Sequence, residues 1–336
     1  MKAGLLFAGQ GAQYEGMGKS LYDAYPAARG IFDRAGDEIK RLCFAGTRAD
    51  LRQTHITQPT VFTVDVAAYA ALREGLAREG LAEADGGGLA IAGLAGFSLG
   101  EYAALTAAGC IADFESALAL VEKRGAYMAE AGRDAAGEQK GAMLAVFGER
   151  QAVLEAVASA RAGDILEAVN FNAPTQTVAA GDLAAIDRLR KRVKETDGLK
   201  AVPLNVSAAF HSPMMEPASE RLAEAVRDMD FSAPRVRVYA NTTGRDLTEG
   251  KPAALSDAAW IRARLALQLK SPVYWQETIE NMAADGIELF IELGPGQTLT
   301  GLVKKISPKA RTLNVAEAEG LESALSSIKE EIGCAR

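Results

Sequence analysis

Short apolar runs alternate with longer amphipathic stretches along the chain, a pattern that predicts an α/β protein. The runs over residues 3–8 and Leu89–Ala95 predict buried strands, and the second reads as a central parallel strand. The three glycines Gly86 to Gly88 predict a loop just before it. Helical patterns lie between these strands, over residues 16–25, 27–41 and 59–80.

The second strand leads into a sharp turn over Gly96–Gly100, and Glu101 begins a helix. Asp113 is a suitable N-cap for a further helix over residues 114–131. A stretch rich in glycine and charge, residues 132–140, then predicts a flexible connection to a differently patterned region.

That region has the order strand–helix–strand–strand–helix–strand, which is the order of the ferredoxin-like unit. We predict a ferredoxin-like small domain, residues 136–206, inserted into a large α/β domain formed by residues 1–135 and 207–336. The strands of the small domain are expected at Ala142–Phe147, Leu166–Phe171, Thr177–Ala180 and Ala201–Val206, and its helices at 149–160 and 183–195. Further strands of the large domain are expected at Val236–Ala240 and Glu288–Glu292.

Composition narrows the class of protein. The chain has 336 residues, of which 49% are hydrophobic and 24% charged, as in ordinary soluble proteins. Its net charge of −7 argues against nucleic acid as a partner, because phosphates attract clustered positive charge. No apolar run reaches the ~18 residues of a membrane helix. Cys43, Cys110 and Cys334 are scattered and lack metal-ligand spacing. We therefore expect a cytoplasmic monomer without membrane contact, disulfides, metal or redox cofactor.

The turn at Gly96–Gly100 matches the Gly-x-Ser-x-Gly elbow, with the strand before it and the helix after it that this pattern requires. Such a turn lifts the hydroxyl of Ser98 above the sheet. It also leaves free N–H groups at the helix start, where the N–H of Leu99 can stabilise an oxyanion. The alternative is a glycine-rich turn with an incidental serine.

Histidine is scarce, since the chain has only His55 and His211. His211 lies just past a predicted strand, in a loop from which it can reach an active site, and is the candidate base. His55 lies in a polar stretch before Pro59 and reads as a surface residue or an indirect neighbour of the site.

Five ordered motifs resemble those of the malonyl-CoA:acyl-carrier-protein transacylases and of the acyltransferase domains of polyketide synthases. The resemblance extends over nearly the whole chain, from about residue 3 to residue 310. The motifs are Gly9-Gln10-Gly11-Ala12-Gln13, Gly96-Phe97-Ser98-Leu99-Gly100-Glu101-Tyr102, Asn170-Phe171-Asn172-Ala173-Pro174, Phe210-His211-Ser212-Pro213-Met214 and Glu292-Leu293-Gly294-Pro295-Gly296.

The resemblance implies an α/β-hydrolase-like large domain with an inserted ferredoxin-like domain. It implies that Ser98 is acylated and that His211 is the base. It assigns to Gln268 the backbone carbonyl that orients the histidine. The oxyanion donors would be the backbone N–H groups of Gln10 and Leu99. The Asn170 motif falls among the substrate-binding positions.

Arg124 lies on the apolar stripe of the helix over 114–131, so its side chain faces inward. A buried arginine needs an anionic partner, and a malonyl carboxylate suits its bidentate fork. The resemblance also places the carboxylate-binding arginine here. The alternative is a structural arginine paired with an internal acid such as Glu101.

Two positions depart from the family pattern. Phe97 stands where histidine is usual, which removes a polar group from the substrate pocket, and Ala8 stands where proline is usual. Leu99 and Phe210 resemble the malonyl-selective pattern, in which Phe210 leaves little room for a branching methyl. One methyl is worth only ~1–3 kcal/mol, so selectivity is expected to be incomplete.

The predicted activity is transfer of a malonyl group from malonyl-CoA, through Ser98, to the phosphopantetheine thiol of an acyl carrier protein. The alternatives are an editing thioester hydrolase with the same dyad, a nucleotide-binding module built on the Gly9–Gly16 loop, and a non-catalytic scaffold. Two basic runs could dock an acidic carrier protein, although a solvated helix face is the simpler interpretation of each. They are Arg188, Arg190, Lys191, Arg192 and Lys194, and Lys304, Lys305, Lys309 and Arg311.

Overall fold

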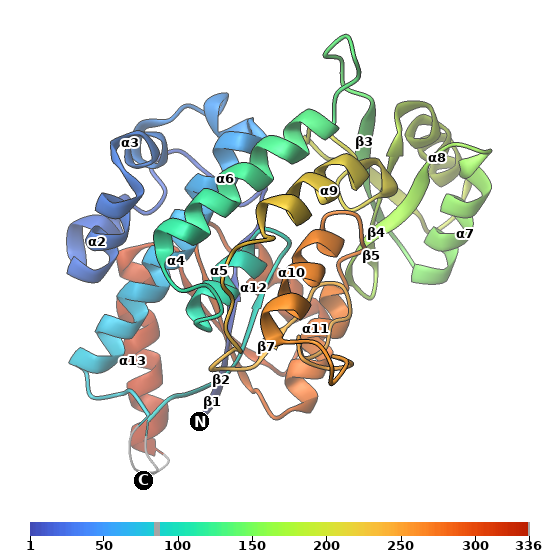
Figure 1. The fold of residues 1–336 in the computed structure, drawn as a ribbon. Coiled ribbons are helices and arrows are strands. Elements are labelled where there is room, and N and C mark those ends of the chain that lie inside the picture. The colour runs from blue at the N-terminus through green and yellow to red at the C-terminus, as the bar shows by residue number, and fades with distance from the viewer. Residues whose placement is uncertain (84–87, 335–336) are drawn as a thin grey trace.

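A computed structural model describes residues 1–83 and 88–334 of the chain. Its elements form two sheets, each with its own helices (Figure 1). Of the predicted glycine loop before the second strand, only Gly88 lies within the described residues, and the side chain of Cys334 lies outside them. None of the helices in the described ranges could cross a membrane.

The large sheet is parallel and has the strand order β7-β2-β1-β8-β9. Side chains of β1 alternate between two cores: Leu5 and Phe7 pack on the side of α4, α5 and α6, whereas Leu6 packs on the side of α11 and α12. The sheet is therefore covered by helices on both faces, as its continuous apolar strands predict. The strands are β1 (Lys2–Phe7), β2 (Ala90–Gly96), β7 (Val238–Tyr239), β8 (Leu289–Leu293) and β9 (Arg311–Val315).

Most helices belong to this larger part. They are α1 (Lys19–Ala24), α2 (Pro26–Ala35), α3 (Asp37–Ala45), α4 (Thr54–Arg78), α5 (Gly100–Ala107), α6 (Phe114–Ala131), α9 (Glu216–Ala225), α10 (Asp257–Gln268), α11 (Trp275–Ala284), α12 (Thr298–Ile306) and α13 (Ala318–Cys334), with 3-10 turns at Asp50–Arg52 and Pro213–Met215.

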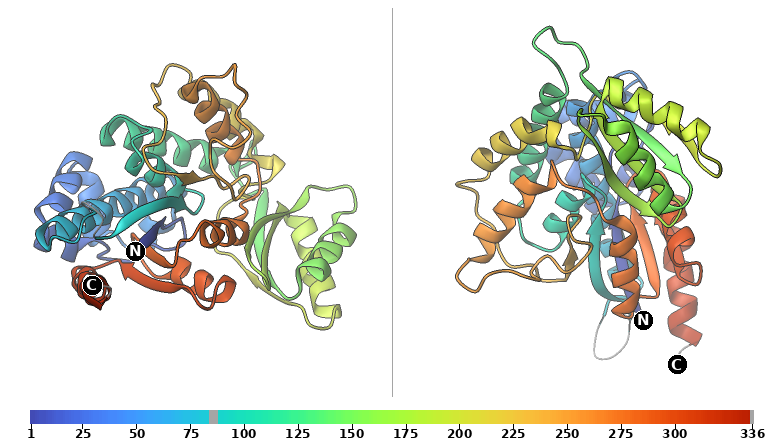
Figure 2. Two further views of the ribbon diagram at one scale, coloured as in Figure 1. Left: turned by 90° about the horizontal axis from the view of Figure 1, so that it is seen from below. Right: turned by 90° about the vertical axis from the view of Figure 1, so that its right-hand side faces the viewer.

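The small sheet is antiparallel and has the order β4-β5-β3-β6, the order of a ferredoxin-like unit. It lies at one end of the molecule with α7 and α8 on its outer face (Figures 1 and 2). Its elements are β3 (Gly141–Phe147), α7 (Arg150–Arg161), β4 (Leu166–Ala173), β5 (Gln176–Asp182), α8 (Leu183–Glu195) and β6 (Lys200–Pro203). The predicted fold class is confirmed, while the predicted domain boundaries stay a prediction.

Alternation along β3 gives the small sheet two different faces. Leu144 and Val146 point into the core beneath α7 and α8, whereas Met143 and Ala145 point to the opposite side and line a cavity against the large part. The edge strand β4 also bonds to the large part, where Phe171 N–H donates to the carbonyl of Val273. The small sheet is thus one wall of an internal space.

Several predicted elements were wrong in extent. The helix predicted over 27–41 is two helices, because Gly36 at φ +89° interrupts it. Helix α4 begins at Thr54 rather than at 59 and runs through Pro59, which the prediction took as its start. Strand β6 ends at Pro203, so residues 204–206 are not a strand. By contrast, α6 and α8 have the predicted bounds, and Asp113 caps α6 by accepting from Ser116 N–H at 2.7 Å.

Candidate active site

The serine elbow forms where β2 passes into α5. Ser98 has φ +51°, a conformation that non-glycine residues adopt rarely. Close packing explains the glycines on either side. A Cβ on Gly96 would lie 1.9 Å from the backbone of Gly100, and one on Gly100 would lie 2.2 Å from the carbonyl oxygen of Phe7. A side chain at either position would therefore collide with neighbouring backbone, which explains why glycine lies on both sides of the serine.

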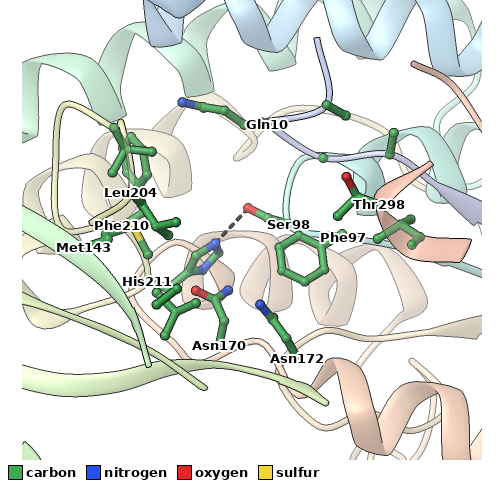
Figure 3. A pocket seen from close by; sticks show the side chains of 18 of the residues that line it. Gln10, Phe97, Ser98, Met143, Asn170, Asn172, Leu204, Phe210, His211 and Thr298 are labelled. Atoms are coloured by element: carbon green, nitrogen blue, oxygen red, sulfur yellow. Dashed lines mark hydrogen bonds between the residues drawn. The ribbon is translucent and has the colours of Figure 1, made fainter. Parts of the chain in front are cut away.

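The structure brings Ser98 and His211 together across 113 residues of sequence. Ser98 Oγ lies 2.7 Å from His211 Nε2 (Figure 3). On the other side of the ring, Nδ1 lies 3.0 Å from the carbonyl oxygen of Gln268 and 3.2 Å from that of Ser271. Two carbonyl oxygens require the proton on Nδ1, so Nε2 is the free base that faces the hydroxyl.

Burial keeps the imidazole neutral. His211 is 4% exposed, and desolvation, with the nearby charge of Arg124, lowers its pKa to about 4. The two carbonyl oxygens oppose this shift but do not overcome it. A neutral imidazole at ordinary pH is the form that can accept the serine proton.

Two backbone N–H groups are available for an oxyanion. Among the described residues, neither Gln10 N–H nor Leu99 N–H donates a hydrogen bond to another protein group. Gln10 lines the cavity at the end of β1, and Leu99 begins the turn into α5. The loop that carries Gln10 is fixed by Ala8, whose N–H donates to the carbonyl of Leu293 at 3.1 Å. Proline, usual at that position, could not make this bond.

Arg124 is buried beside the serine. It is 1% exposed, and its Nη2 donates to Ser98 Oγ at 3.1 Å and to Gln268 Oε1 at 3.1 Å. Its Nη1 donates to Gln58 Oε1 at 2.7 Å, and Nε has no partner among the described residues. No carboxylate of the described residues lies within 4.0 Å of this guanidinium. Direct pairing with Glu101, the structural alternative, is therefore wrong.

Asn241 is a supporting residue that sequence analysis missed. Its Oδ1 accepts from Ser98 N–H at 2.7 Å and its Nδ2 donates to the Gly96 carbonyl at 2.7 Å, so one amide holds both sides of the elbow. A signal was present: Asn241 follows a predicted strand, and the carboxyl ends of parallel strands collect functional groups. Gln58 was also missed. It lies just before the helix predicted over 59–80, and only the structure shows it fully buried inside α4.

A cavity of about 240 Å³ lies between the two sheets and reaches Ser98. Phe97, Phe210 and Asn170 line it (Figure 3), whereas the side chain of Leu99 is fully buried and does not. Phe97 packs edge-on against Trp275, with ring centroids 5.4 Å apart, so the position usual for histidine is an apolar part of the wall.

Three further observations concern the remaining candidates. His55 is exposed on the first turn of α4, as a surface residue would be. In the described residues no group of three or more His, Cys, Asp or Glu is arranged to hold a metal ion. Cys43 and Cys110 are buried free thiols.

Comparisons with known proteins agree with this geometry. The model of the acyl transferase domain family matches residues 5–322. The chain is 36% identical to malonyl CoA-acyl carrier protein transacylase of Bacillus subtilis (strain 168), over 98% of each protein. It resembles the crystal structure of the transacylase of Clostridium perfringens ATCC 13124 with a TM-score of 0.86 and 34% identity, over 100% and 99% of the two chains. It also resembles a malonyl-transacylase solved in complex with its type II PKS acyl-carrier protein, with a TM-score of 0.85 and 33% identity, over 97% of this chain and 100% of the other.

Proposed function

The chain belongs to the acyl transferase domain family, and we propose that it moves a malonyl group from malonyl-CoA to the phosphopantetheine thiol of an acyl carrier protein. Ser98 holds the malonyl group as an ester between the two half-reactions. The observation that carries the proposal is the buried Arg124, which lies 3.1 Å from Ser98 Oγ without a carboxylate partner of its own in the described residues. An acyl group that brings its own carboxylate satisfies this site, and acetyl does not.

In the first half-reaction, His211 Nε2 takes the proton of Ser98 Oγ as the oxygen attacks the thioester carbonyl. The N–H groups of Gln10 and Leu99 stabilise the oxyanion. When the C–S bond breaks, the imidazolium returns its proton to the sulfur of CoA. A malonyl ester of Ser98 remains, with its carboxylate on Arg124.

The second half-reaction runs the same steps in reverse order. His211 accepts the proton of the phosphopantetheine thiol as the sulfur attacks the ester, and then protonates Ser98 Oγ as it leaves. Because the same cavity serves both thiols, donor and acceptor bind in turn and ping-pong kinetics are expected.

Phe210 is the residue we propose for selection against branched acyl groups, because its ring lines the cavity directly. Leu99 does not reach the cavity with its side chain and acts through its N–H alone. One methyl group is worth about 1–3 kcal/mol, so methylmalonyl-CoA is expected to be a slow substrate rather than an excluded one.

Of the two basic runs, the one at the end of α12 suits carrier docking better. Helix α12 lines the cavity with Leu299 and Leu302, and Lys305 Nζ donates to Gln176 Oε1, a residue of the cavity wall, at 3.4 Å. The run on α8 lies on the outer face of the small sheet (Figure 1). Each run has an arginine in an ion pair, Arg188 with Asp164 at 2.6 Å and Arg311 with Glu331, so the position of α12 beside the cavity decides the choice.

The other hypotheses are not favoured. The relatives that match the chain over nearly its whole length are named transacylases, which argues against an editing hydrolase, a nucleotide-binding module and a scaffold. We further propose that the protein acts in the cytoplasm as a monomer and needs no bound cofactor. Size-exclusion chromatography with light scattering tests the monomer.

The proposal is tested by transfer to a purified carrier protein. The protein is mixed with malonyl-CoA and either the holo or the apo form of the carrier, and intact mass follows the carrier. Malonylation of the holo form alone is expected. Rapid release of free malonate, equal with both forms, would replace the proposal by the hydrolase.

A further inference from the structure

Glu101 is a buried carboxyl group with no direct part in the steps above. It lies in the first turn of α5, three residues past Ser98, and is 1% exposed. Its Oε2 accepts from Asn241 N–H at 2.9 Å and from Gln268 Nε2 at 3.1 Å. Burial raises its pKa to about 7, against the opposing effect of these bonds and of Arg124. Its charge is therefore finely balanced near neutral pH.

One side-chain amide connects Glu101 to the substrate-facing arginine. Gln268 Oε1 accepts from Arg124 Nη2 at 3.1 Å, while Gln268 Nε2 donates to Glu101 at 3.1 Å. Because the amide is polarised from the carboxylate toward the guanidinium, a negative Glu101 strengthens the bond to Arg124. In the empty site, Arg124 is therefore linked to Glu101 indirectly, through the side-chain amide of Gln268.

We propose that Glu101 is a positioning residue that balances the charge of Arg124 in the empty site and takes up a proton when a malonyl carboxylate arrives. The inference rests on the proposed function, since it requires an acyl group that carries a carboxylate. Two carboxylates then compete for one guanidinium, and the buried Glu101, which has weaker access to it, is protonated. By linkage, protonated Glu101 must favour the malonyl group by the same factor.

Among the titratable groups around it with a shifted pKa, Glu101 is the one that titrates near neutral pH. The guanidinium groups of Arg124 on α6 and Arg264 on α10 both favour the ionised form of Glu101. Burial raises the pKa of the adjacent Tyr102 to about 12, so its phenol is neutral. His211, with a pKa of about 4, is neutral as well.

The test is the ratio of kcat/KM for malonyl-CoA to that for acetyl-CoA, measured from pH 6 to pH 9. His211 acts equally on both substrates, so its titration cancels in the ratio. The wild-type ratio is expected to fall about tenfold as pH rises, which corresponds to a shift of about one pKa unit in Glu101. In Glu101→Gln, which imitates the protonated form, the ratio is expected to stay at its low-pH value throughout.

A second variant separates charge coupling from a structural role. Arg264→Gln removes a positive charge that favours ionised Glu101, so the midpoint of the wild-type fall is expected to move to higher pH. A merely structural defect would lower both substrates' kcat/KM without moving this midpoint.

Proton uptake tests the inference on the wild type alone. Acylation itself moves the serine proton to the CoA thiol and leaves the count unchanged. Malonyl-CoA in weakly buffered solution at pH 7 is expected to draw about 0.4 of a proton per site more than acetyl-CoA. Equal uptake, or a pH-independent ratio in an enzyme that does transfer malonyl groups, overturns this inference alone. Absence of any malonyl transfer overturns the proposed function instead.

Discussion

The parallel sheet and the antiparallel sheet both border the cavity, but they bring different atoms to it. Loops at the carboxyl ends of β1 and β2 bring Gln10 and Ser98, whose polar atoms are arranged for bond making. Strands of the antiparallel sheet bring apolar side chains, among them Met143, Ala145 and Val178. They also bring the amides of Asn170, Asn172 and Gln176, but among the described residues none of these amides hydrogen-bonds to Ser98 or His211. Changes to the groups that make and break bonds should therefore alter rate, whereas changes to side chains that only line the cavity should alter which acyl group or thiol is accepted. Arg124 and Phe210 belong to the lining, although they come from the large part.

The largest effect is expected from His211→Ala on the reactive side. Loss of the base should lower kcat/KM for malonyl-CoA by about 10²–10⁴-fold, because general base catalysis typically contributes that much. Stopped-flow release of CoA measures it. Met143→Ala on the opposite wall is the matched control, and an equally large loss there would remove the contrast between the two sides.

Arg124→Ala should reduce preference more than rate. Two charge-assisted hydrogen bonds to the malonyl carboxylate are lost, so the malonyl-to-acetyl ratio of kcat/KM should fall about 100-fold. Arg124→Lys keeps the charge without the planar fork and should recover only part of the preference. An unchanged ratio in Arg124→Ala would remove this residue from carboxylate recognition.

Phe210→Ala tests whether the wall selects by size. The larger cavity should raise kcat/KM for methylmalonyl-CoA relative to malonyl-CoA by about tenfold, because the two substrates differ by one methyl group. Competition between the two thioesters, read by intact mass, measures the ratio. Leu99→Ala is the comparison, and a larger change there would transfer the selectivity to a side chain that does not touch the cavity.

Carrier docking gives a smaller effect. Lys304→Ala with Lys305→Ala on α12 should raise KM for the carrier about threefold at low salt and much less at high salt, because exposed charges chiefly steer encounter. The matched pair Lys191→Ala and Lys194→Ala on α8 should leave KM unchanged. The reverse result would place docking on the small domain.

The smallest effect concerns pH. A pKa of about 4 keeps His211 neutral, so kcat/KM for acetyl-CoA should change less than twofold between pH 5.5 and 8. The depressed pKa also adds stability that is present above the unfolded value of 6.5 and is lost as pH falls toward 4. An acid limb centred at 6.5 would contradict the burial of the imidazole.

Sequence alone predicted the fold class and most strands because apolar runs and glycine turns are local signals. It also identified Ser98, His211 and Arg124 as candidate site residues, because the resemblance to a known family assigned a role to each. The bounds of α4 were missed because proline is tolerated inside a helix where the packing on both sides is strong, and 17 of its residues are buried. The break at Gly36 was missed because an amphipathic pattern continues across it.

The supporting residues were harder to predict. Asn241 and the side chain of Gln268 act on Ser98 from positions 143 and 170 residues away, through contacts that no local pattern encodes. Likewise, Leu204 and Val206 line the cavity because β6 ends early, which their apolar character did not indicate. Long-range contacts of single polar groups depend on the assembled fold rather than on periodicity.

The central claim is that Ser98 holds the malonyl group as an ester beside Arg124. Brief incubation with malonyl-CoA, followed by intact mass and peptide mapping, tests it most directly. The account predicts one malonyl adduct on the peptide that contains Ser98, absent from Ser98→Ala. An unmodified wild-type protein, or an equal adduct on Ser98→Ala, would contradict it.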